Sequence, residues 1–384
     1  MLPLNLVDST RSVRPAWIEI DLARLRANFA CINQFRPPNV GLISVVKDDA
    51  YGHGAPQVAR MALEFGARWL ALATLEEARD LRANGITAPI LMLGQRHPSE
   101  LPECIELQLT CSIGDLETAR VLNNLSQALH VHSPVHVKID TGMNRYGVRW
   151  SDAPHFIRSL QPLDHLQIEG VFSHFAMSDE LDKSYAHLQL DRFNETLHQL
   201  TIHQIAAGVR HFCNSGGLLD LPQAHFDCVR TGLLPLGVYP SQVCRRLNTL
   251  QPVMSVKTRL AHIRHLQPGD CVGYGMRYTA KEPRRIAVLP IGYGDGFPRV
   301  RNQGEVLVHG KRAPLIGGVS MDAITIDITH IPEAQPWDEV VLMGEQQGDA
   351  ITIHDVAKLK QSVSYDALTA WRGRLPRVYL NTSP

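Results

Sequence analysis

The side chains best suited to chemistry in this sequence follow short apolar runs within the first 240 residues. Lys47 comes directly after the β-branched run 40–46, and Arg230 follows the run 226–229. A lysine withdrawn from water has a lowered pKa, and its neutral amine can form a Schiff base with a carbonyl compound. The alternative is a lysine that extends from a strand end into solvent and does no chemistry. Other polar residues in similar positions are Lys138 with Asp140, His174, and Asn214 with Ser215.

These residues would share one location if the apolar runs were parallel strands. Further strand-like runs at 69–73, 89–93, 135–139, 168–174 and 209–212 alternate with amphipathic helical segments. Seven or eight such units within residues 20–240 fit a (β/α)8 barrel better than an open doubly wound sheet. Because a barrel carries its active site at the carboxyl ends of its strands, the polar residues above are predicted to surround one site.

Local signals place several helices and the second domain. Asp21 is a good N-cap for the first helix, and Thr74 with Glu77 has the spacing of a capping box. After about residue 250 the pattern changes to short alternating strands, such as 285–289, 305–309 and 323–328, separated by turns. We therefore predict a barrel over residues 15–250 and a β-rich domain over residues 251–384, with residues 1–20 able to pack with the second domain.

Composition excludes several classes of protein. Lys+Arg and Asp+Glu number 38 each, and a net charge of zero argues against a partner such as nucleic acid or a membrane surface. No apolar stretch approaches the roughly 18 residues of a transmembrane helix, and residues 1–10 lack the pattern of a signal peptide. The seven cysteines form no CxxC pair and are typical of reduced thiols in a cytoplasmic protein.

A metal site is not predicted, although the chain has 18 histidines. There is no HExxH motif, and Pro134 lies between His132 and His136, so this pair cannot share a helix face.

A set of segments in this sequence resembles the conserved blocks of the alanine racemase family. The resemblance extends from about Ala16 to Tyr379, with the blocks in the family's order and spacing. Any one block is weakly specific, whereas the whole set is highly specific. The blocks are 45–54, 138–147, 211–215, 229–232, 272–275, 290–296 and 320–322.

The resemblance implies a homodimer of barrel and β-domain chains, whose active site holds pyridoxal 5′-phosphate and is completed by the partner chain. Lys47 would carry the cofactor and exchange a proton on one face of the substrate α-carbon. Tyr274 of the other subunit would serve the opposite face. Such a two-base arrangement suits racemisation, because one proton leaves one face and another arrives on the other. The implied activity is interconversion of L-alanine and D-alanine, in the cytoplasm, for D-alanine biosynthesis and the bacterial cell wall.

The resemblance also implies which residues contact the cofactor. Arg230 would face the pyridine nitrogen, and a guanidinium that accepts no proton should make the ring a weaker electron sink than a carboxylate partner would. His174 would bridge Arg230 and Tyr274. The backbone near Gly232 and Leu233, together with Tyr51 and Ser215, would hold the phosphate. The full set of implied cofactor contacts is Lys47, Tyr51, His174, Asn214, Ser215, Arg230, Gly232, Leu233 and Tyr365.

The substrate contacts implied by the resemblance are Arg145, for the carboxylate, and Met321 of the second chain, which would close the pocket. Lys138 matches a position that is carbamylated in some members, which would turn a cation into an anion beside Arg145. Structural roles are the alternatives: a core methionine for Met321, a structural histidine for His174 and a surface ion pair for Arg230.

Four positions depart from the family pattern. Asp48 stands where alanine is usual, and Thr231 and Leu236 replace a proline and a tyrosine. Gly318 lies where many members carry an arginine that lines the approach to the pocket, although Arg299 on that approach is present. Asp48 is expected to be tolerated on a loop, whereas the difference at Gly318 bears on substrate admission and selectivity.

Other functions remain open from sequence. A racemase for serine or a broader range of amino acids would share the same mechanism. A decarboxylase of the same architecture should lack the blocks around Tyr274 and Met321, both of which are present. A non-enzymatic cofactor-binding protein of the barrel-only kind would not need the C-terminal β-rich domain.

Overall fold

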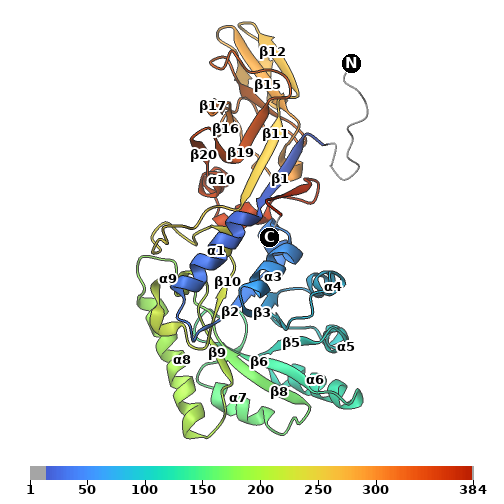
Figure 1. The fold of residues 1–384 in the computed structure, drawn as a ribbon, viewed down its shortest axis with the longest axis vertical. Helices are drawn as coiled ribbons and strands as arrows, with labels where there is room; N and C mark the ends of the chain where they lie inside the picture. Colours follow the sequence, from blue (N-terminus) through green and yellow to red (C-terminus); the bar gives the residue numbers. More distant parts are fainter. Residues whose placement is uncertain (1–13, 383–384) are drawn as a thin grey trace. The chain divides into compact units, whose positions relative to one another are not determined.

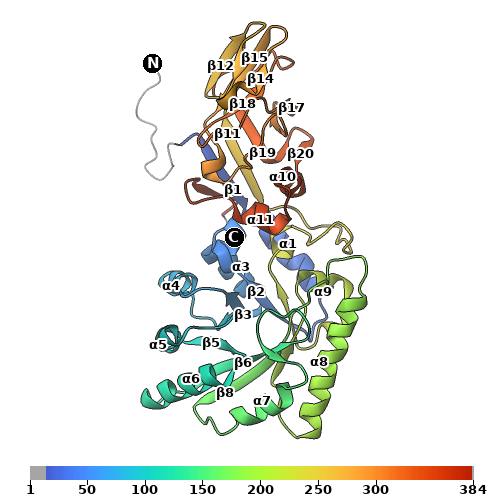
Figure 2. The ribbon, with the colours of Figure 1, turned by 180° about the vertical axis from the view of Figure 1, so that it is seen from behind.

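The structure is a computed structural model that describes residues 14–382, and the chain divides into two compact units (Figures 1 and 2). Residues 25–251 form the barrel unit, and residues 14–24 with 252–382 form the β unit. Expectations that concerned residues 1–13, including the absence of a signal peptide, lie outside the described residues. Because the chain enters the barrel unit within its first helix, the first strand is separated from the barrel and belongs to the β unit.

The barrel unit is a closed ring of parallel strands, which confirms the predicted (β/α)8 fold. Each strand pairs in parallel with the next, and pairing of β5 with β6 and of β10 with β2 closes the ring. A short strand β7 (Val148–Arg149) adds to β6 outside the ring. The barrel strands are β2 (Gly41–Val45), β3 (Ala67–Leu72), β4 (Ile90–Met92), β5 (Leu109–Ile113), β6 (Ser133–Asp140), β8 (Leu166–Phe172), β9 (Val209–His211) and β10 (Cys228–Thr231).

Helices cover the outside of the ring, as Figures 1 and 2 show for α3 to α8. Strands of a closed parallel barrel are covered on both faces, and β2 and β5 are accordingly buried over nearly their whole length. The helices are α1 (Leu22–Phe35), α2 (Lys47–Gly52), α3 (Ala55–Glu64), α4 (Leu75–Ala83), α5 (Leu101–Glu106), α6 (Leu116–Ala128), α7 (Ala153–Leu160), α8 (Ser184–Ile202) and α9 (Ser215–Asp220).

Predicted helix starts are present. The side chain of Asp21 accepts hydrogen bonds from the amides of Ala23 and Arg24 at 2.9 and 3.1 Å, and Thr74 with Glu77 forms the predicted capping box of α4. The strand β5 was not predicted, because two of its residues, Thr110 and Ser112, are polar and interrupt the apolar run. None of the helices described between residues 14 and 382 is long and apolar enough to span a membrane.

The β unit is organised around one large, mainly antiparallel sheet. Its strand order is β17-β16-β19-β11-β1-β21, with β20 attached to β19. The strands of this sheet are β1 (Ala16–Asp21), β11 (Met254–Arg259), β16 (Glu305–Val308), β17 (Lys311–Pro314), β19 (Glu339–Gln346), β20 (Asp349–Ile351) and β21 (Arg377–Leu380). The predicted β-rich character of the C-terminal part is therefore confirmed.

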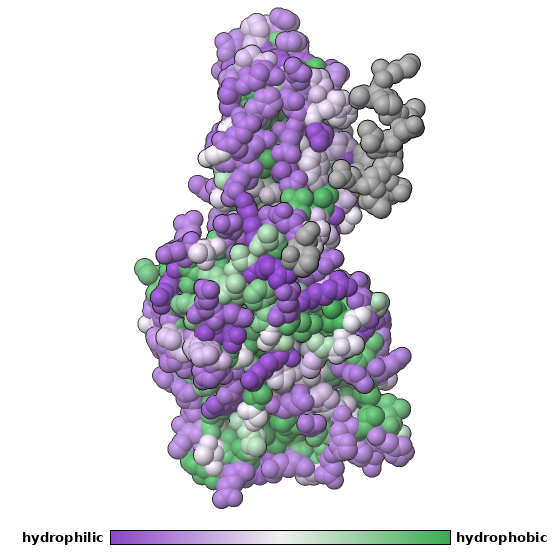
Figure 3. Space-filling view, viewed as in Figure 1, coloured by the Kyte–Doolittle hydropathy of each residue, from purple (hydrophilic) through white to green (hydrophobic). Residues whose placement is uncertain are grey.

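Smaller elements complete the β unit. The face of this unit that Figure 3 shows is mostly hydrophilic, which fits strands with one buried and one solvated face. Strand β18 shows this alternation, because Ile324 and Ile326 are buried and Thr325 between them is only partly so. The remaining strands are β12 (His262–Leu266), β13 (Cys271–Val272), β14 (Tyr278–Thr279), β15 (Arg284–Leu289) and β18 (Ile324–Asp327), and the helices are α10 (Ile353–Lys360) and α11 (Ser364–Thr369).

Candidate active site

The polar residues predicted to line a site do lie at the carboxyl ends of barrel strands. Lys47 follows β2, Lys138 lies near the end of β6, and Arg230 is the penultimate residue of β10. His174 follows β8, and Asn214 follows β9. Because all eight strands run in parallel, these ends meet at one rim of the barrel, where the side chains can act on one another.

The segment after Lys47 has an unusual backbone. Four consecutive residues, Asp48 to Tyr51, have φ between 51° and 54°, so they form one turn of left-handed helix. The amide of Ala50 donates to the carbonyl of Val46 at 2.9 Å across this turn. Left-handed geometry costs about 1–2 kcal/mol per residue outside glycine, so this turn is held by its surroundings.

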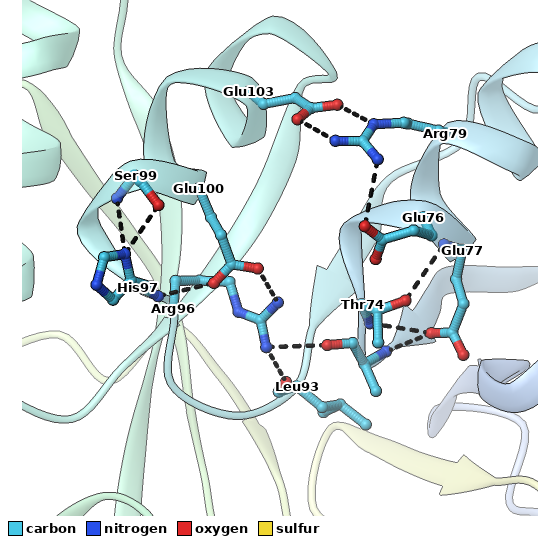
Figure 4. A network of polar contacts seen from close by, with 11 residues as sticks. Thr74, Glu76, Glu77, Arg79, Leu93, Arg96, His97, Ser99, Glu100 and Glu103 are labelled. Atoms are coloured by element: carbon cyan, nitrogen blue, oxygen red, sulfur yellow. Dashed lines mark hydrogen bonds and ion pairs between the residues drawn. The ribbon is translucent and has the colours of Figure 1, made fainter.

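Glu77 is one of the groups that hold the turn. Its carboxylate accepts hydrogen bonds from the amides of Ala73 at 2.8 Å and Thr74 at 3.0 Å, and it also accepts one from the amide of Asp48. Arg96 also holds this segment, because its guanidinium donates a hydrogen bond to the carbonyl of Ala73 at 2.9 Å. Figure 4 shows Glu77 and Arg96 reaching the same strand end from opposite sides. The start of α4 is thereby fastened to the residue that follows Lys47.

Electrostatics favour a neutral Lys47. Burial lowers the pKa of its amine, and the positive charge of Arg145 lowers it further. Arg145 itself is exposed, on the loop after β6. Both influences shift Lys47 toward its neutral form, in which the amine can act as a nucleophile or accept a proton.

Arg230 is buried and is bound by neutral acceptors. Its Nη1 donates to Nδ1 of His211 at 2.8 Å, and its Nη2 donates to Nδ1 of His174 at 3.0 Å. The same two nitrogens donate to the carbonyls of Ser173 at 2.7 Å, Phe212 at 3.0 Å and His211 at 3.1 Å. Burial lowers the pKa of Arg230 to about 10, which still leaves the guanidinium charged at neutral pH. The surface ion pair considered from sequence is wrong for this residue.

Three imidazoles, those of His174, His211 and His136, lie around Arg230. Burial, and then the charge of Arg230, lowers the pKa of His174 well below its usual value, and that of His211 likewise. Nδ1 of His136 lies 2.8 Å from Nε2 of His211. Burial lowers the pKa of His136 to about 4. Three neutral imidazoles therefore accompany one buried cation.

Lys138 occupies the same cationic cluster. Burial lowers the pKa of its amine well below the usual value, followed by the charges of Arg230 and Arg145. Its Nζ lies 4.8 Å from the centre of the Phe172 ring, and Cζ of Arg230 lies 5.4 Å from the same ring. The aromatic ring thus attracts two cations that repel each other.

A second group of predicted contacts meets around Gly232. A side chain at this position would place its Cβ 2.6 Å from the hydroxyl oxygen of Tyr51, so only glycine fits. The amide of Gly232 donates to the hydroxyl of Ser215 at 3.4 Å. Asn214 caps α9 by accepting from the amide of Gly217 at 2.9 Å, and Leu233 is buried beside these residues in the chain. Two hydroxyls and a backbone amide are therefore gathered at the end of β10.

The other predicted residues belong to the β unit. Tyr274 is 84% exposed and Met321 is 52% exposed, whereas Tyr365 is partly buried in α11. The exposure of Met321 contradicts the core-methionine alternative. Gly273, next to Tyr274, is in contact with the backbone of Gly318, where an added Cβ would lie 3.4 Å from the amide nitrogen.

Gly318, one of the departures from the family pattern, lies against Arg301. An added Cβ on Gly318 would meet Cγ of Arg301 at 3.7 Å, and these two residues form an antiparallel bridge. The stem of Arg301 thus occupies the direction of the missing side chain. Cζ of Arg299 lies 5.5 Å from the centre of the Tyr293 ring in the same unit.

Sequence reasoning missed two of these features. His136 was considered only as a metal ligand with His132, but His132 stacks on His165, 5.2 Å between ring centres, while His136 contacts His211. The signal that could have found it is the period of two in β6, which places His136 on the same face as Lys138. The left-handed turn has no comparable signal, because Ala50 and Tyr51 rarely adopt that conformation.

Fold and site together define a (β/α)8-barrel protein with a lysine of lowered pKa and a buried arginine at the carboxyl rim. The family model for the alanine racemase N-terminal domain matches residues 20–240, and the model for the alanine racemase C-terminal domain matches residues 253–379. The chain belongs to the alanine racemase family, which confirms the resemblance seen in the sequence.

Individual relatives agree over nearly the whole chain. An alanine racemase from Halothermothrix orenii is 40% identical over 97% of this chain and 98% of its own, and one from Syntrophobacter fumaroxidans is 43% identical over 91% and 94%. Among solved structures, alanine racemase from Clostridium difficile has a TM-score of 0.93 at 33% identity, covering 97% of this chain and 98% of its own. The enzyme from Bacillus anthracis with bound L-Ala-P has a TM-score of 0.91 at 34% identity and 97% coverage of both chains.

The buried imidazoles should make the protein sensitive to acid. A folded-state pKa below the unfolded value means that the unfolded chain binds the proton first as the pH falls. The free energy of unfolding should therefore decrease between about pH 6.5 and pH 4, with roughly 3 kcal/mol of the loss due to His136. Urea unfolding at a series of pH values measures this. His136→Asn, which does not titrate, should lose less stability over the same range; an equal loss would contradict the assignment.

Proposed function

We propose that the protein interconverts L-alanine and D-alanine with pyridoxal 5′-phosphate as its cofactor, and that it does so as a homodimer. The observation that carries this proposal is the cluster of Lys47, Lys138, Arg145 and Arg230 at the barrel rim, where burial and the charge of Arg145 lower the pKa of Lys47. Four basic side chains with overlapping fields are suited to a ligand that brings several negative charges. The names of the relatives are those of racemases, and the comparisons do not favour the decarboxylase or carrier alternatives.

The phosphate of the cofactor fits the residues around Gly232. The hydroxyls of Tyr51 and Ser215 lie beside the Gly232 amide, and the absence of a side chain there leaves the backbone approachable. Anions in proteins are commonly bound by such hydroxyl and amide donors. We assign Tyr51, Ser215, Gly232 and the adjoining backbone of Leu233 to the phosphate, with Asn214 holding the start of α9 in place.

The ring nitrogen of the cofactor fits Arg230. Both terminal nitrogens of the guanidinium are occupied by carbonyls and imidazoles, while its Nε–H donates to no residue in the described part of the chain. One donor is therefore left for a neutral pyridine nitrogen, and an arginine has no acceptor with which to take a proton from the ring. This arrangement should limit side reactions that need a strongly electron-withdrawing ring.

Two side chains of this protein would move the protons. Once the amino group of the substrate has replaced Lys47 on the cofactor, the cofactor would supply delocalisation of the electron pair that remains when the α-proton leaves. The neutral amine of Lys47 would then exchange a proton on one face of the α-carbon, and the phenol of Tyr274 from the partner subunit on the other. His174 lies between Arg230 and this incoming phenol in the proposal, and its remaining nitrogen, Nε2, is the one that can face the phenol.

The substrate would be held by its carboxylate. Arg145 is the charged and exposed residue suited to that contact, and Met321 of the β unit is proposed to bound the pocket, while Tyr365 stays among the proposed cofactor contacts. Carbamylation of Lys138 is proposed because a buried amine of lowered pKa is nucleophilic toward carbon dioxide, and the resulting anion would offset the charge of Arg145. Alanine is the proposed substrate because the relatives are named alanine racemases, and a pocket sized for a methyl group would discriminate against each added group by about 1–3 kcal/mol.

The dimer is proposed from the β unit. Large apolar side chains there are exposed, with Met276 at 70% and Tyr274 at 84%, although solvent is a poor environment for both. Cover by a second copy of the chain would bury them and deliver Tyr274 to the partner's barrel.

The proposal is tested by a racemisation assay on purified protein with pyridoxal phosphate, followed by chiral chromatography. L-alanine should reach an equal mixture of enantiomers, and L-serine, L-lysine and L-arginine should react at least about tenfold more slowly. Lys47→Ala and the charge-preserving Lys47→Arg should both lose the visible absorbance of bound cofactor together with the activity. Failure of wild-type protein to racemise any of these amino acids while the cofactor is bound would overturn the function.

Tyr274→Phe should affect the two directions unequally. If the phenol serves one face only, removing its hydroxyl should slow α-proton exchange from one enantiomer far more than from the other. Solvent-deuterium incorporation, measured separately with L-alanine and D-alanine, reports both rates. Equal losses for the two enantiomers would rule out the assignment of Tyr274 to a single face.

A site shared between subunits makes a complementation experiment informative. Lys47→Ala and Tyr274→Phe should each be impaired, yet a mixed dimer contains one site with both native residues. Co-expression of the two variants should therefore restore up to about a quarter of wild-type activity. Mixed Lys47→Ala and Lys47→Arg chains are the control and should stay inactive; no gain from the first mixture would place both residues in one subunit.

A further inference from the structure

A line of ring contacts crosses the interior of the barrel unit behind Arg230. His211 at the end of β9 bonds Arg230 of β10 through Nδ1 and His136 of β6 through Nε2, both at 2.8 Å. Trp69 of β3 lies at the far end, with its ring centre 5.6 Å from that of His136 and the two planes inclined by 69°. These contacts link strands on different sides of the ring that Figure 1 shows.

The chemistry of arginine fixes the position of every proton in this line. A guanidinium has donors only, so Nδ1 of His211 must present a lone pair to Nη1 of Arg230. The proton of His211 is then on Nε2, where it is donated to Nδ1 of His136. His136 must in turn carry its own proton on Nε2. Both imidazoles are thus neutral and of one defined tautomer.

Among residues 14–382 the line ends at the ring of Trp69. Nε2 of His136 is buried and has no hydrogen-bond partner within these residues. The rings of Trp69 and His136 meet in a T-shaped contact, and Nε1 of Trp69 is likewise buried without a partner. The tautomer of His136 is therefore set by its bond to His211.

The surrounding strands make room for this arrangement. A side chain on Gly170 of β8 would place its Cβ 2.4 Å from the carbonyl oxygen of Val209 and 3.2 Å from Cε1 of His136, so glycine is needed for these groups to lie this close. The ring of Phe172 stacks on His211, 4.8 Å between centres with planes 6° apart. One face of His211 and both of its nitrogens are therefore held, and the ring has no second orientation that satisfies Arg230.

We infer that His136 is a positioning residue that acts through His211: by accepting its Nε2–H, it keeps a lone pair toward Arg230 and so aims the guanidinium. If His136 offered no acceptor, the buried Nε2–H of His211 would be unsatisfied, and the opposite tautomer would become preferable. That tautomer turns an N–H toward the N–H of Arg230, which would displace the guanidinium and its Nε. The consequence for the cofactor ring rests on the proposed function, whereas the tautomer of His211 does not.

Two substitutions separate the acceptor from the bulk of the ring. In His136→Asn the side-chain oxygen takes the place of Nδ1 and keeps the acceptor; in His136→Leu a side chain of similar size has none. If the leucine variant is insoluble, His136→Gln replaces it, because its amide reaches the position of Nε2 instead. Circular dichroism and thermal unfolding establish that the variants compared are folded.

The first readout is the tautomer of His211, observed by nitrogen NMR of histidine-labelled protein, with the signal assigned by its loss in His211→Gln. Wild-type protein and His136→Asn should carry the proton on Nε2, and His136→Leu should show the Nδ1 form. Because this measurement is possible with or without turnover, it is independent of the proposed racemase activity. Identical tautomers in the asparagine and leucine variants would overturn the inference.

The second readout is the visible spectrum of protein reconstituted with pyridoxal phosphate. With Arg230 held in place, the spectrum should be insensitive to pH between 6 and 9 in wild-type protein and in His136→Asn, and it should titrate in His136→Leu. Turnover of alanine should fall about tenfold in kcat for the leucine variant, with KM little changed, and stay close to wild type for asparagine. A uniform loss in both variants would show a merely structural role, and absence of any cofactor band in wild-type protein would instead count against the proposed function.

Discussion

The burial of one guanidinium constrains most of what surrounds it. Arg230 is 3% exposed, and a charge withdrawn from water to that extent is tolerable only when its donors are satisfied. At both terminal nitrogens of the guanidinium, the structure meets this demand with carbonyls from the ends of β8 and β9 and with two imidazoles, and not with a carboxylate. The positive charge therefore remains uncompensated, and it is felt by His174, His211 and Lys138, whose pKa values are all lowered by it after burial. An anionic ligand is the counterpart that such a site is built to receive.

The strand ends set the positions of these groups, but the connecting turn sets the position of Lys47. A left-handed turn is unfavourable for Ala50 and Tyr51, and it persists because Glu77 accepts the amide of Asp48 while Asp49 accepts the amide of Ala55 at 2.8 Å. The same turn buries Tyr51 and directs its hydroxyl toward Gly232. One short strained segment thus places both the lysine and a hydroxyl of the proposed phosphate site.

Sequence patterns predicted the features that recur along the chain, such as buried strands and capped helices. They missed the features that depend on a single contact. Alternating apolar runs and helix caps identified the barrel, because buried parallel strands and capped helices recur many times in the chain. The same approach overlooked β5, whose Thr110 and Ser112 break the apolar pattern although both are buried, and it had no signal for the left-handed turn at residues 48–51. His136 shows the limit for the site, because its type and spacing suggested only a metal ligand, whereas it contacts His211 of another strand. Resemblance to a family selected the candidate site residues, but the hydrogen-bond directions required coordinates.

The pairing of β1 has a consequence for how the chain is made. Strand β1 lies between β11 and β21 in the large sheet of the β unit, in antiparallel register with Met254–Arg259 and parallel to Arg377–Leu380. Of the strands described, β1 is the first to be synthesised, but both of its edges are covered only after β21 has been made. All the barrel strands, by contrast, are synthesised in one uninterrupted stretch between these two events. During translation the barrel can close while β1 still presents unpaired backbone groups, so β1 is the segment that a chaperone or a neighbouring nascent chain would encounter.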